Sequence, residues 1–226
     1  MTSAALDVHE LSKDFGDAAV VGPLTLEVAD GERVVIIGHN GSGKTTMLRM
    51  VAGLLEPSTG GASVDGHPVG SIEARAATSY LADQPVFYDD LSVREHLEFI
   101  ARLHGREDWA TDADELLDRL ALTDRADHLP RTFSRGLRQR VAIAIAMIRP
   151  FSLLLVDEPF VGLDRSGRDA LLALLAQAHQ RGAALLVATH ELTTVGELDR
   201  VIALRDGSIV FDGSATSADL AMLTTK

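Results

Sequence analysis

The sequence contains no cysteine at any of its 226 positions. This absence excludes disulfide bonds, thiolate catalysis and cysteine-ligated zinc. Long apolar segments are also missing, since the longest uninterrupted run, residues 141–148, lies between Arg140 and Arg149. A membrane-spanning helix needs about 20 apolar residues, so we expect no span. Acidic residues, Asp7 and Glu10, interrupt the N-terminal segment, and we therefore expect no secretory signal there.

Basic residues are in the minority. The chain carries 21 lysine and arginine residues against 33 aspartate and glutamate residues, which gives a formal net charge of −12. This charge disfavours nucleic acid and anionic lipid headgroups as partners, although a local basic site can still bind phosphates. Apolar residues at 46% and charged residues at 24% are typical of a globular protein. The length fits a single α/β domain over residues 1–226, with room for an embedded subdomain.

A glycine-rich loop follows an apolar strand early in the sequence. Residues 38–45 satisfy the phosphate-loop motif G-x-x-x-x-G-K-[ST], between a strand over 34–37 and a helix predicted over 45–55. In such a loop the backbone amides point at phosphate oxygens, Lys44 reaches the β- and γ-phosphates, and Thr45 offers its hydroxyl to Mg²⁺. The predicted nucleotide-contacting residues of this region are Gly38, His39, Asn40, Gly41, Ser42, Gly43, Lys44, Thr45 and Thr46.

The phosphate loop alone defines only a superfamily. Kinases, GTPases, helicases and transporters all remain open at this point. A guanine-specific protein would be expected to carry an Asn/Thr-Lys-x-Asp sequence, and none of the three lysines, Lys13, Lys44 and Lys226, belongs to one. Adenine is therefore the favoured base.

Two acidic residues and a histidine follow buried strands further along the chain. The apolar strand over 152–156 runs into Asp157 and Glu158, at the carboxyl edge of the sheet where ligands of doubly wound folds bind. Asp157 would hold Mg²⁺ through its water shell, and Glu158 could polarise the attacking water. His190 follows a strand over 184–188 at the same edge, where it could contact the γ-phosphate or position water. Spacing alone leaves a surface or core role for His190 open.

Strands alternate with helices through the second half of the sequence. The periodicity predicts helices over 135–148 and 165–180 around the strands at 152–156 and 184–188. Strands separated by crossover helices form a mostly parallel sheet. The first 35 residues instead alternate short apolar stretches with polar breaks, which predicts an N-terminal antiparallel β subdomain.

The middle third of the sequence has a helical character. Ser92 and Glu95 form a capping-box pattern ahead of apolar residues at helical spacing, and residues 111–122 repeat that spacing. We therefore expect a helical subdomain inserted at about residues 85–150.

A third motif narrows the superfamily to a family. Residues 132–140, Thr-Phe-Ser-Arg-Gly-Leu-Arg-Gln-Arg, resemble the signature motif of ABC (ATP-binding cassette) ATPases. The resemblance covers nearly the whole chain, and its residues occur in the family's order. They are Phe15, the phosphate loop, Gln84, the signature, Asp157 with Glu158, Gly162-Leu163-Asp164, and His190.

The resemblance implies a head-to-tail dimer that holds ATP between the phosphate loop of one subunit and the signature of the other. Ser134 and the amide of Gly136 would then meet the γ-phosphate from across the interface, next to Arg135. Asp164 resembles the acid that links the two sites across the dimer. The match also strengthens Glu158 as general base and His190 as a catalytic residue beside Lys44.

Three further roles come from the resemblance. Phe15 occupies the place of the aromatic residue that stacks on adenine in similar proteins. Without the family resemblance, packing in the hydrophobic core is the alternative role of Phe15. Gln84 resembles the glutamine that touches Mg²⁺ or water and senses the transmembrane partner. Residues 84–105 resemble the region that receives the membrane subunits. The alternative is that these residues form a packed helical cover that binds no partner.

The signature departs from the commonest form, Leu-Ser-Gly-Gly-Gln. Arg135 replaces its first glycine and Leu137 replaces its glutamine. The Ser-Arg-Gly sequence resembles a variant of drug, antibiotic and polysaccharide exporters. Arg135 could add positive charge near the partner's nucleotide or contact the opposing subunit, and the sequence does not decide between the two.

We therefore expect an α/β P-loop cassette that hydrolyses MgATP, as a homodimer or heterodimer, and drives separate transmembrane permease subunits. The signature variant favours export over import. The expected location is cytoplasmic, peripheral on the inner face of the cell membrane through the permease, with no nucleic-acid partner. The alternatives are an ABC ATPase without membrane partners and a nucleotide-binding module that regulates a partner without hydrolysing ATP.

Overall fold

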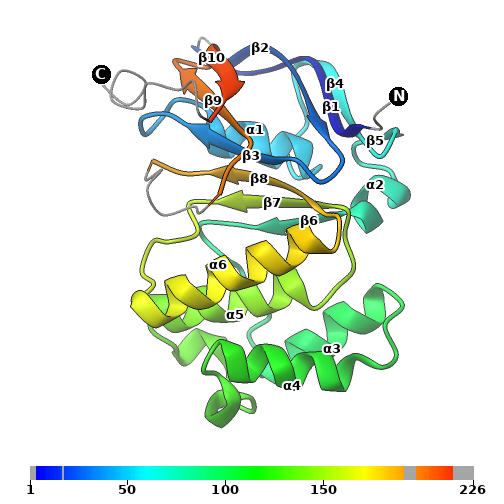
Figure 1. Ribbon diagram of the computed structural model, residues 1–226, viewed down its shortest axis with the longest axis vertical. Helices are drawn as coiled ribbons and strands as arrows, with labels where there is room; N and C mark the ends of the chain where they lie inside the picture. The colour runs from blue at the N-terminus through cyan, green and yellow to red at the C-terminus, as the bar shows by residue number, and fades with distance from the viewer. Residues whose placement is uncertain (1–3, 17, 191–196, 216–226) are drawn as a thin grey trace. The chain divides into compact units, whose positions relative to one another are not determined.

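The computed structural model describes residues 4–16, 18–190 and 197–215. The chain divides into two compact units (Figure 1). Unit 1 comprises residues 1–80, 151–158 and 178–226, and unit 2 comprises residues 81–150 and 159–177.

A six-stranded sheet forms the centre of unit 1, in the order β10-β9-β3-β8-β7-β6 (Figure 1). Strands β9, β3, β8 and β7 pair in parallel, and β10 adds an antiparallel edge to β9. The strands are β3 (Arg33–Ile37), β6 (Thr78–Leu81), β7 (Leu153–Asp157), β8 (Ala184–Ala188), β9 (Arg200–Arg205) and β10 (Ser208–Ser214). This mostly parallel sheet confirms the predicted fold class.

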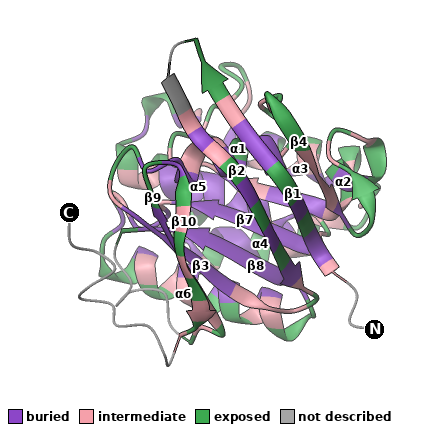
Figure 2. Ribbon diagram, turned by 90° about the horizontal axis from the view of Figure 1, so that it is seen from above, coloured by how far each residue is buried: buried purple, intermediate pink, exposed green. Residues whose placement is uncertain are grey.

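The central strands of this sheet are buried along their whole length. Every residue of β7 and β8 is buried, and Figure 2 shows both strands in the colour of buried residues. A parallel strand covered on both faces needs a continuous apolar run, which Leu153–Val156 provides. The first polar residues after that run therefore emerge at the carboxyl edge of the sheet.

A second sheet of unit 1 is antiparallel, as the N-terminal alternation predicted. Its order is β2-β1-β4-β5, with β1 (Ala4–Phe15), β2 (Ala18–Ala29), β4 (Thr59–Val64) and β5 (His67–Pro68). Strand β1 is longer than the short apolar stretches of this region because it continues through register shifts between Val8 and Lys13. The sequence did not predict β4, β5 or the short helix α2 (Ile72–Ala77).

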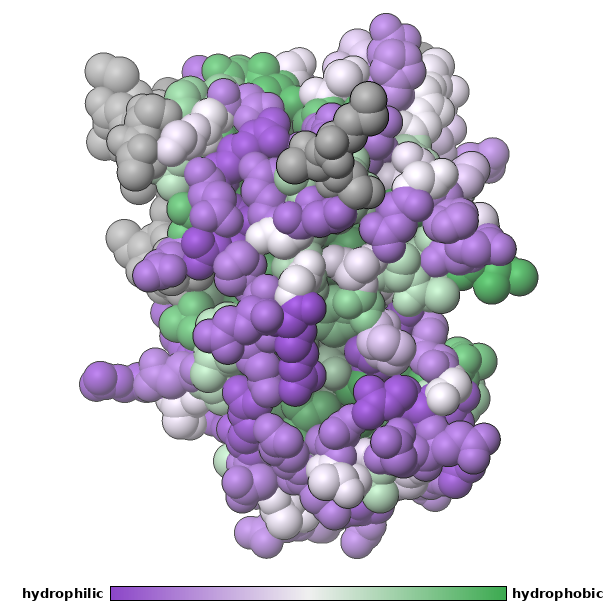
Figure 3. All heavy atoms as spheres, turned by 45° about the vertical axis from the view of Figure 1, so that its right-hand side comes forward, coloured by the Kyte–Doolittle hydropathy of each residue, from purple (hydrophilic) through white to green (hydrophobic). Residues whose placement is uncertain are grey.

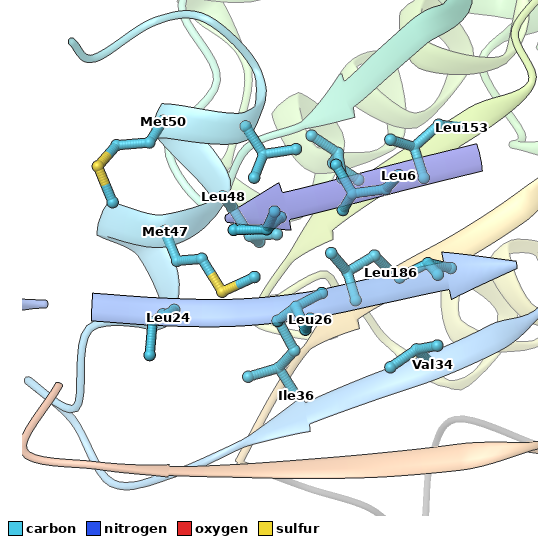
Figure 4. Packing of buried hydrophobic residues seen from close by; sticks show 14 of the residues in the cluster. Leu6, Leu24, Leu26, Val34, Ile36, Met47, Leu48, Met50, Leu153 and Leu186 are labelled. Atoms are coloured by element: carbon cyan, nitrogen blue, oxygen red, sulfur yellow. The ribbon is translucent and has the colours of Figure 1, made fainter. Parts of the chain in front are cut away.

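The core of unit 1 packs helix α1 (Lys44–Val51) among strands of both sheets. Met47 and Leu48 are fully buried. Figure 4 shows them beside Leu24 and Leu26 of β2 and Ile36 of β3, with further buried residues of β1, β7 and β8 around them. Because α1 begins at Lys44, its burial fixes the end of the phosphate loop against the sheets.

Unit 2 is helical. It contains α3 (Val93–Leu103), α4 (Trp109–Arg119), α5 (Arg135–Met147) and most of α6 (Arg165–Gln180), with short 3₁₀ turns at Thr123–Arg125 and Pro130–Thr132. The predicted capping box is confirmed: Glu95 N donates to Ser92 Oγ at 3.2 Å, and Ser92 N donates to Glu95 Oε2 at 2.7 Å. Helix α3 therefore begins where its sequence says it should.

Hydrophilic side chains cover much of the face drawn in Figure 3, with apolar side chains gathered in places among them. Across the described residues we find no helix with the length and hydropathy that a membrane span requires.

Candidate active site

The phosphate loop connects β3 to α1 in unit 1, and its glycines are required by space and by backbone conformation. A Cβ atom on Gly38 would lie 2.4 Å from the Leu204 carbonyl oxygen. Gly43 adopts φ 102°, a left-handed conformation that disfavours other residues. Both glycines therefore let the loop turn tightly between the strand and the helix.

A contact that the sequence did not predict holds this loop from outside. The turn between β9 and β10 has positive φ at both Asp206 (48°) and Gly207 (77°), as a type I′ hairpin turn requires. Gly207 N donates to Ser42 O at 3.1 Å, and Gly22 N donates to Gly207 O at 2.9 Å. An Asp-Gly pair such as Asp206-Gly207 is typical of a hairpin turn, but nothing in its sequence indicates that the turn supports the phosphate loop.

Lys44 lies at the centre of the loop, and 6% of its side chain is exposed. Its ammonium group donates to Gly38 O at 2.8 Å and to His39 O at 3.4 Å. It also lies 3.6 Å from Glu158 Oε1. The loop thus presents a nearly buried cation whose counterion is the carboxylate at the end of β7.

Glu158 and His190 meet at the carboxyl edge of the sheet. His190 Nδ1 lies 2.8 Å from Glu158 Oε2, and since an ionised carboxylate only accepts, the imidazole donates. Glu158 N donates to Ala188 O at 2.8 Å, which joins the end of β7 to β8. Glu158 also adopts φ 44°, a costly conformation for a residue with a side chain. Backbone and side chain together hold this carboxylate between Lys44 and His190.

Asp157 is fully buried one residue earlier, at the last position of β7. Tyr80 OH donates to Asp157 Oδ2 at 3.4 Å. Burial and then the Asp157 carboxylate raise the pKa of Tyr80, so its hydroxyl stays protonated and able to donate. The two acids that follow one another in the sequence therefore lie in different surroundings, as their proposed division of labour requires.

Phe15 and His39 are two further predicted nucleotide-contacting residues of unit 1. Phe15 ends β1 with 54% of its surface exposed, and the Lys13 ammonium lies 5.4 Å from the centre of its ring. Exposure excludes core packing as the reason for Phe15. His39 Nδ1 lies 2.8 Å from Asn40 O, and its Nε2 lies 3.4 Å from Asp206 Oδ1.

Unit 2 holds the signature residues. Ser134 caps the N-terminus of α5, where its Oγ accepts from Leu137 N at 3.4 Å. A Cβ atom on Gly136 would lie 2.6 Å from Gly162 O, so glycine is required where the signature meets the loop before α6. The side chain of Arg135 reaches Asp83 within its own chain, with Nη2 3.4 Å from Oδ1, which is neither of the two roles that the sequence suggested for Arg135.

Asp164 and Gln84 complete the predicted set in unit 2. Asp164 Oδ1 accepts from Gly167 N at 2.9 Å at the start of α6, and from Arg140 Nη2 at 2.5 Å. The hydrogen bond from the Gly167 amide has the largest effect on the pKa of Asp164, and it lowers this pKa together with the bond from Arg140. Gln84 is exposed after β6. Thus Lys44, Glu158 and His190 meet in unit 1, whereas Gln84, Ser134, Arg135, Gly136 and Asp164 belong to unit 2.

The comparison with protein families decides what this site belongs to. Residues 21–161, from β2 to the loop after β7, match the sequence model of the ABC transporter family. The chain belongs to the ABC transporter family. It is an ATP-binding and ATP-hydrolysing subunit of that family, which agrees with a phosphate loop followed by Asp157, Glu158 and His190.

Relatives of this ABC subunit support the assignment along most of its length. A putative ABC transporter ATP-binding protein of Halobacterium salinarum is 40% identical, with 92% of each chain covered. The SkfA peptide export ATP-binding protein SkfE of Bacillus subtilis is 35% identical, with 92% of this chain and 88% of that protein covered. A dimeric structure of a bacterial ABC transporter cassette superposes with a TM-score of 0.85 at 26% identity, covering 92% of this chain and 98% of that one.

The residues of the ABC subunit also fit a magnesium nucleotide. Ser42 Oγ is buried in the phosphate loop without a hydrogen-bond partner in the described structure, which suits a loop that binds oxygen-rich phosphate. Thr45 and Asp157 offer oxygen donors, the type that Mg²⁺ takes. No group of three or more His, Cys, Asp or Glu residues converges as a metal site within the described ranges. Mg²⁺ bound to a nucleotide needs few protein ligands, because substrate phosphates and water complete its coordination shell.

Proposed function

We propose that this ATPase subunit works as a head-to-tail dimer, as a homodimer or with a second cassette, and that closure of the dimer on MgATP moves separate membrane subunits. The observation that carries the catalytic part is Glu158, held 3.6 Å from the Lys44 ammonium and 2.8 Å from His190 Nδ1. A carboxylate fixed on both sides can receive a proton from water at a defined position.

The roles of the residues follow from these contacts. Glu158 is the general base, and His190 orients it through the Nδ1–H donor. When the nucleotide binds, the γ-phosphate gives the Lys44 ammonium a second anionic partner and so leaves Glu158 available to water. When bound, Mg²⁺ would neutralise charge on the phosphates, with Thr45 and Asp157 of unit 1 as its protein ligands. The family resemblance adds Gln84 as a further candidate ligand. Phe15 is exposed and can stack on adenine.

The dimer is supported by the composition of the signature surface and by the solved dimer of a related cassette. Ser134 and Arg135 are exposed, and the first turn of α5 contains no acidic residue. This end of α5 therefore suits the γ-phosphate of an ATP bound to the facing subunit. Asp164, bonded beside it, would contact the opposite site.

An exposed apolar patch in unit 2 supports docking of the membrane subunits. Its large residues are Val86 (95% exposed), Tyr88 (54%), Phe99 (41%) and Leu103 (66%). The Tyr88 and Phe99 rings contact each other edge to face, with centroids 5.4 Å apart. All four lie within residues 84–105, the region proposed to receive a helix of the membrane partner, which would place the subunit at the inner face of the membrane. Apolar patches on a globular surface commonly mark such interfaces.

Export is the proposed direction of transport. It is supported by the export role in the name of SkfE and by the Ser-Arg-Gly signature. Uptake into inverted vesicles containing the subunit and its membrane partner tests the direction, since an exporter loads such vesicles when ATP is outside. Loading of right-side-out vesicles instead would show import.

The hydrolytic mechanism is tested by Glu158→Gln. This change keeps the shape of the side chain but removes the base, so hydrolysis should fall about a hundred-fold or more. Bound ATP should persist, and size-exclusion chromatography should show an ATP-dependent dimer. Glu73→Gln, on the exposed first turn of α2, is the matched control and should hydrolyse like the wild type. Wild-type rates in Glu158→Gln would overturn the role of Glu158.

A further inference from the structure

Arg135 joins three segments of unit 2. Its guanidinium lies 3.4 Å from Asp83 Oδ1, in the loop after β6 and next to Gln84. A Cβ atom on Gly162 would lie 3.3 Å from Arg135 Cγ and 3.5 Å from its Cδ, so the stem of the side chain lies over the loop before α6. One side chain of the signature therefore contacts both the segment that carries Gln84 and the segment that leads to Asp164.

The position of this arginine is electrostatically unusual. Arg135 is the first residue of α5, whose first turn contains no acidic residue. The N-terminus of a helix carries partial positive charge, which disfavours a cation there. The carboxylate of Asp83 compensates for this repulsion. The observed conformation thus depends on an anion, and Asp83 supplies it from within the chain.

The bond to Asp83 is weak enough to be exchanged. The side chains of Arg135 and Asp83 are 59% and 31% exposed, and their one contact is long. By contrast, Arg33 binds Asp199 through two nitrogens at 2.8 and 3.0 Å. Exposed single contacts contribute little to stability, whereas a guanidinium binds phosphate through several oxygens at once.

We propose that Arg135 exchanges anions during the ATPase cycle. Without a facing nucleotide it pairs with Asp83; in the dimer its guanidinium leaves Asp83 and binds the terminal phosphate of the ATP held by the facing subunit. This inference rests on the proposed head-to-tail dimer. Release of Asp83 frees the neighbouring Gln84 segment, so arrival of nucleotide at one subunit changes the loop that leads to the docking region of the other.

If Asp83 and the phosphate compete for Arg135, substitutions of Asp83 and Arg135 should shift the ATP concentration for half-maximal dimerisation in opposite directions. Asp83→Asn removes the competing carboxylate and should lower the ATP concentration for half-maximal dimerisation, by about two- to five-fold for an exposed pair. Arg135→Gln removes the phosphate ligand and should raise that concentration, by about ten-fold for a charge-assisted bond. Arg135→Lys keeps the charge and should lie between wild type and Arg135→Gln. In Arg135→Gln, the added Asp83→Asn should have no further effect.

The measurement is sedimentation velocity of the purified subunit across a titration of a non-hydrolysable ATP analogue with Mg²⁺. Asp114→Asn is the matched control, because Asp114 forms an exposed ion pair with Arg94 in the same unit, and its midpoint should equal the wild type's. Thermal unfolding of each variant verifies that it is folded.

Shifts of the same sign for Asp83→Asn and Arg135→Gln would show a purely structural pair and overturn the exchange, as would an unchanged midpoint for Asp83→Asn. A wild type that stays monomeric at every nucleotide concentration would overturn the proposed dimer, and the exchange with it.

Discussion

Gly38 and Gly61 are two glycines of unit 1 that differ in the space around them. A Cβ atom on Gly38 would be 2.4 Å from Leu204 O, whereas one on Gly61 would meet nothing within 4 Å. Neither requires positive φ, so the comparison isolates the steric effect. Alanine at Gly38 forces the phosphate loop away from β9.

Gly38→Ala should therefore destabilise the fold by about 1–3 kcal/mol and weaken ATP binding about ten-fold or more, since the loop cannot close as observed. Gly61→Ala should change both quantities little. Urea unfolding and fluorescent-nucleotide titration measure them. Equal effects of the two substitutions would contradict the steric account of Gly38.

His104, at the C-terminal end of α3, gives stability a dependence on pH. Burial, and then the charge of Arg149, lower the pKa of His104 below its ordinary value of 6.5. Between its folded-state pKa and 6.5 the unfolded chain binds more protons than the folded one. Stability is therefore complete above that range and falls as the pH is lowered through it.

Replacing the histidine tests this account. His104→Gln cannot take up the proton, so the free energy of unfolding should fall less steeply than in the wild type as the pH is lowered from 6.5 toward the folded-state pKa of His104. Above that range the two proteins should differ by a constant amount. Urea unfolding across a pH series measures the slopes, and identical slopes would remove His104 as the cause.

Single residues also show what the sequence could and could not predict. Asp157, Glu158 and His190 were predicted to share a sheet edge because each follows a continuous apolar strand, and strands of that kind lie parallel at the centre of a sheet. The Glu158–His190 contact follows from that arrangement. The bonds Arg135–Asp83 and Gly207–Ser42 join residues far apart in the chain, and no local pattern encodes them.

At the scale of elements, His96 holds the loop before α3 against the helix. Its Nδ1 lies 2.8 Å from Ser92 O, and its Nε2 accepts from Tyr88 N at 3.0 Å. Since the carbonyl only accepts, Nδ1 carries the proton, and the buried ring satisfies one donor and one acceptor at once. The Phe87 ring packs edge to face against it. The apolar patch that begins at Val86 is thus fixed to α3 through one imidazole.

His96→Phe should retain the ring packing but leave the Tyr88 amide without its acceptor, at a cost of about 1–3 kcal/mol. Hydrogen exchange of the residue 85–91 segment should accelerate relative to that of α5. ATPase activity of the isolated subunit and its stimulation by the membrane partner can be measured in parallel, and stimulation should suffer more. Unchanged exchange in this segment would contradict the proposed anchoring.

Elements differed in how readily the sequence predicted them. Helix α6 and strand β8 have the predicted bounds because their periodicity and apolar runs are uninterrupted. Strand β4 was missed since its start contains Gly60 and Gly61, residues depleted in strands. Its partner β1 explains Gly60, whose Cβ would lie 2.1 Å from Glu10 O where β1 shifts register. The local residue propensities disfavour a strand here, and β4 forms because it pairs with β1 from a distant part of the chain.

For the whole molecule, binding and hydrolysis should respond differently to metal removal. Lys44 and the loop amides bind phosphate without a metal, so ATP in EDTA should still raise the melting temperature. At a hundred-fold excess over Kd, a ligand adds about 2.7 kcal/mol of stability. Hydrolysis should stop, because the proposed ligands Thr45 and Asp157 then hold no cation against the phosphates. Calorimetry and phosphate release measure the two, and hydrolysis at full rate in EDTA would refute the magnesium site.

The support that Gly207 gives to Ser42 also bears on the order in which the molecule is made. The two residues lie far apart in the sequence, yet the Gly207 amide bonds to the phosphate loop, and Gly22 bonds to the same turn. A ribosome completes the phosphate loop long before it reaches the hairpin that supports it. Unlike contacts between sequence neighbours, this one forms only after residue 207 has emerged. The nascent protein therefore cannot finish its nucleotide site until the β9–β10 hairpin has been synthesised.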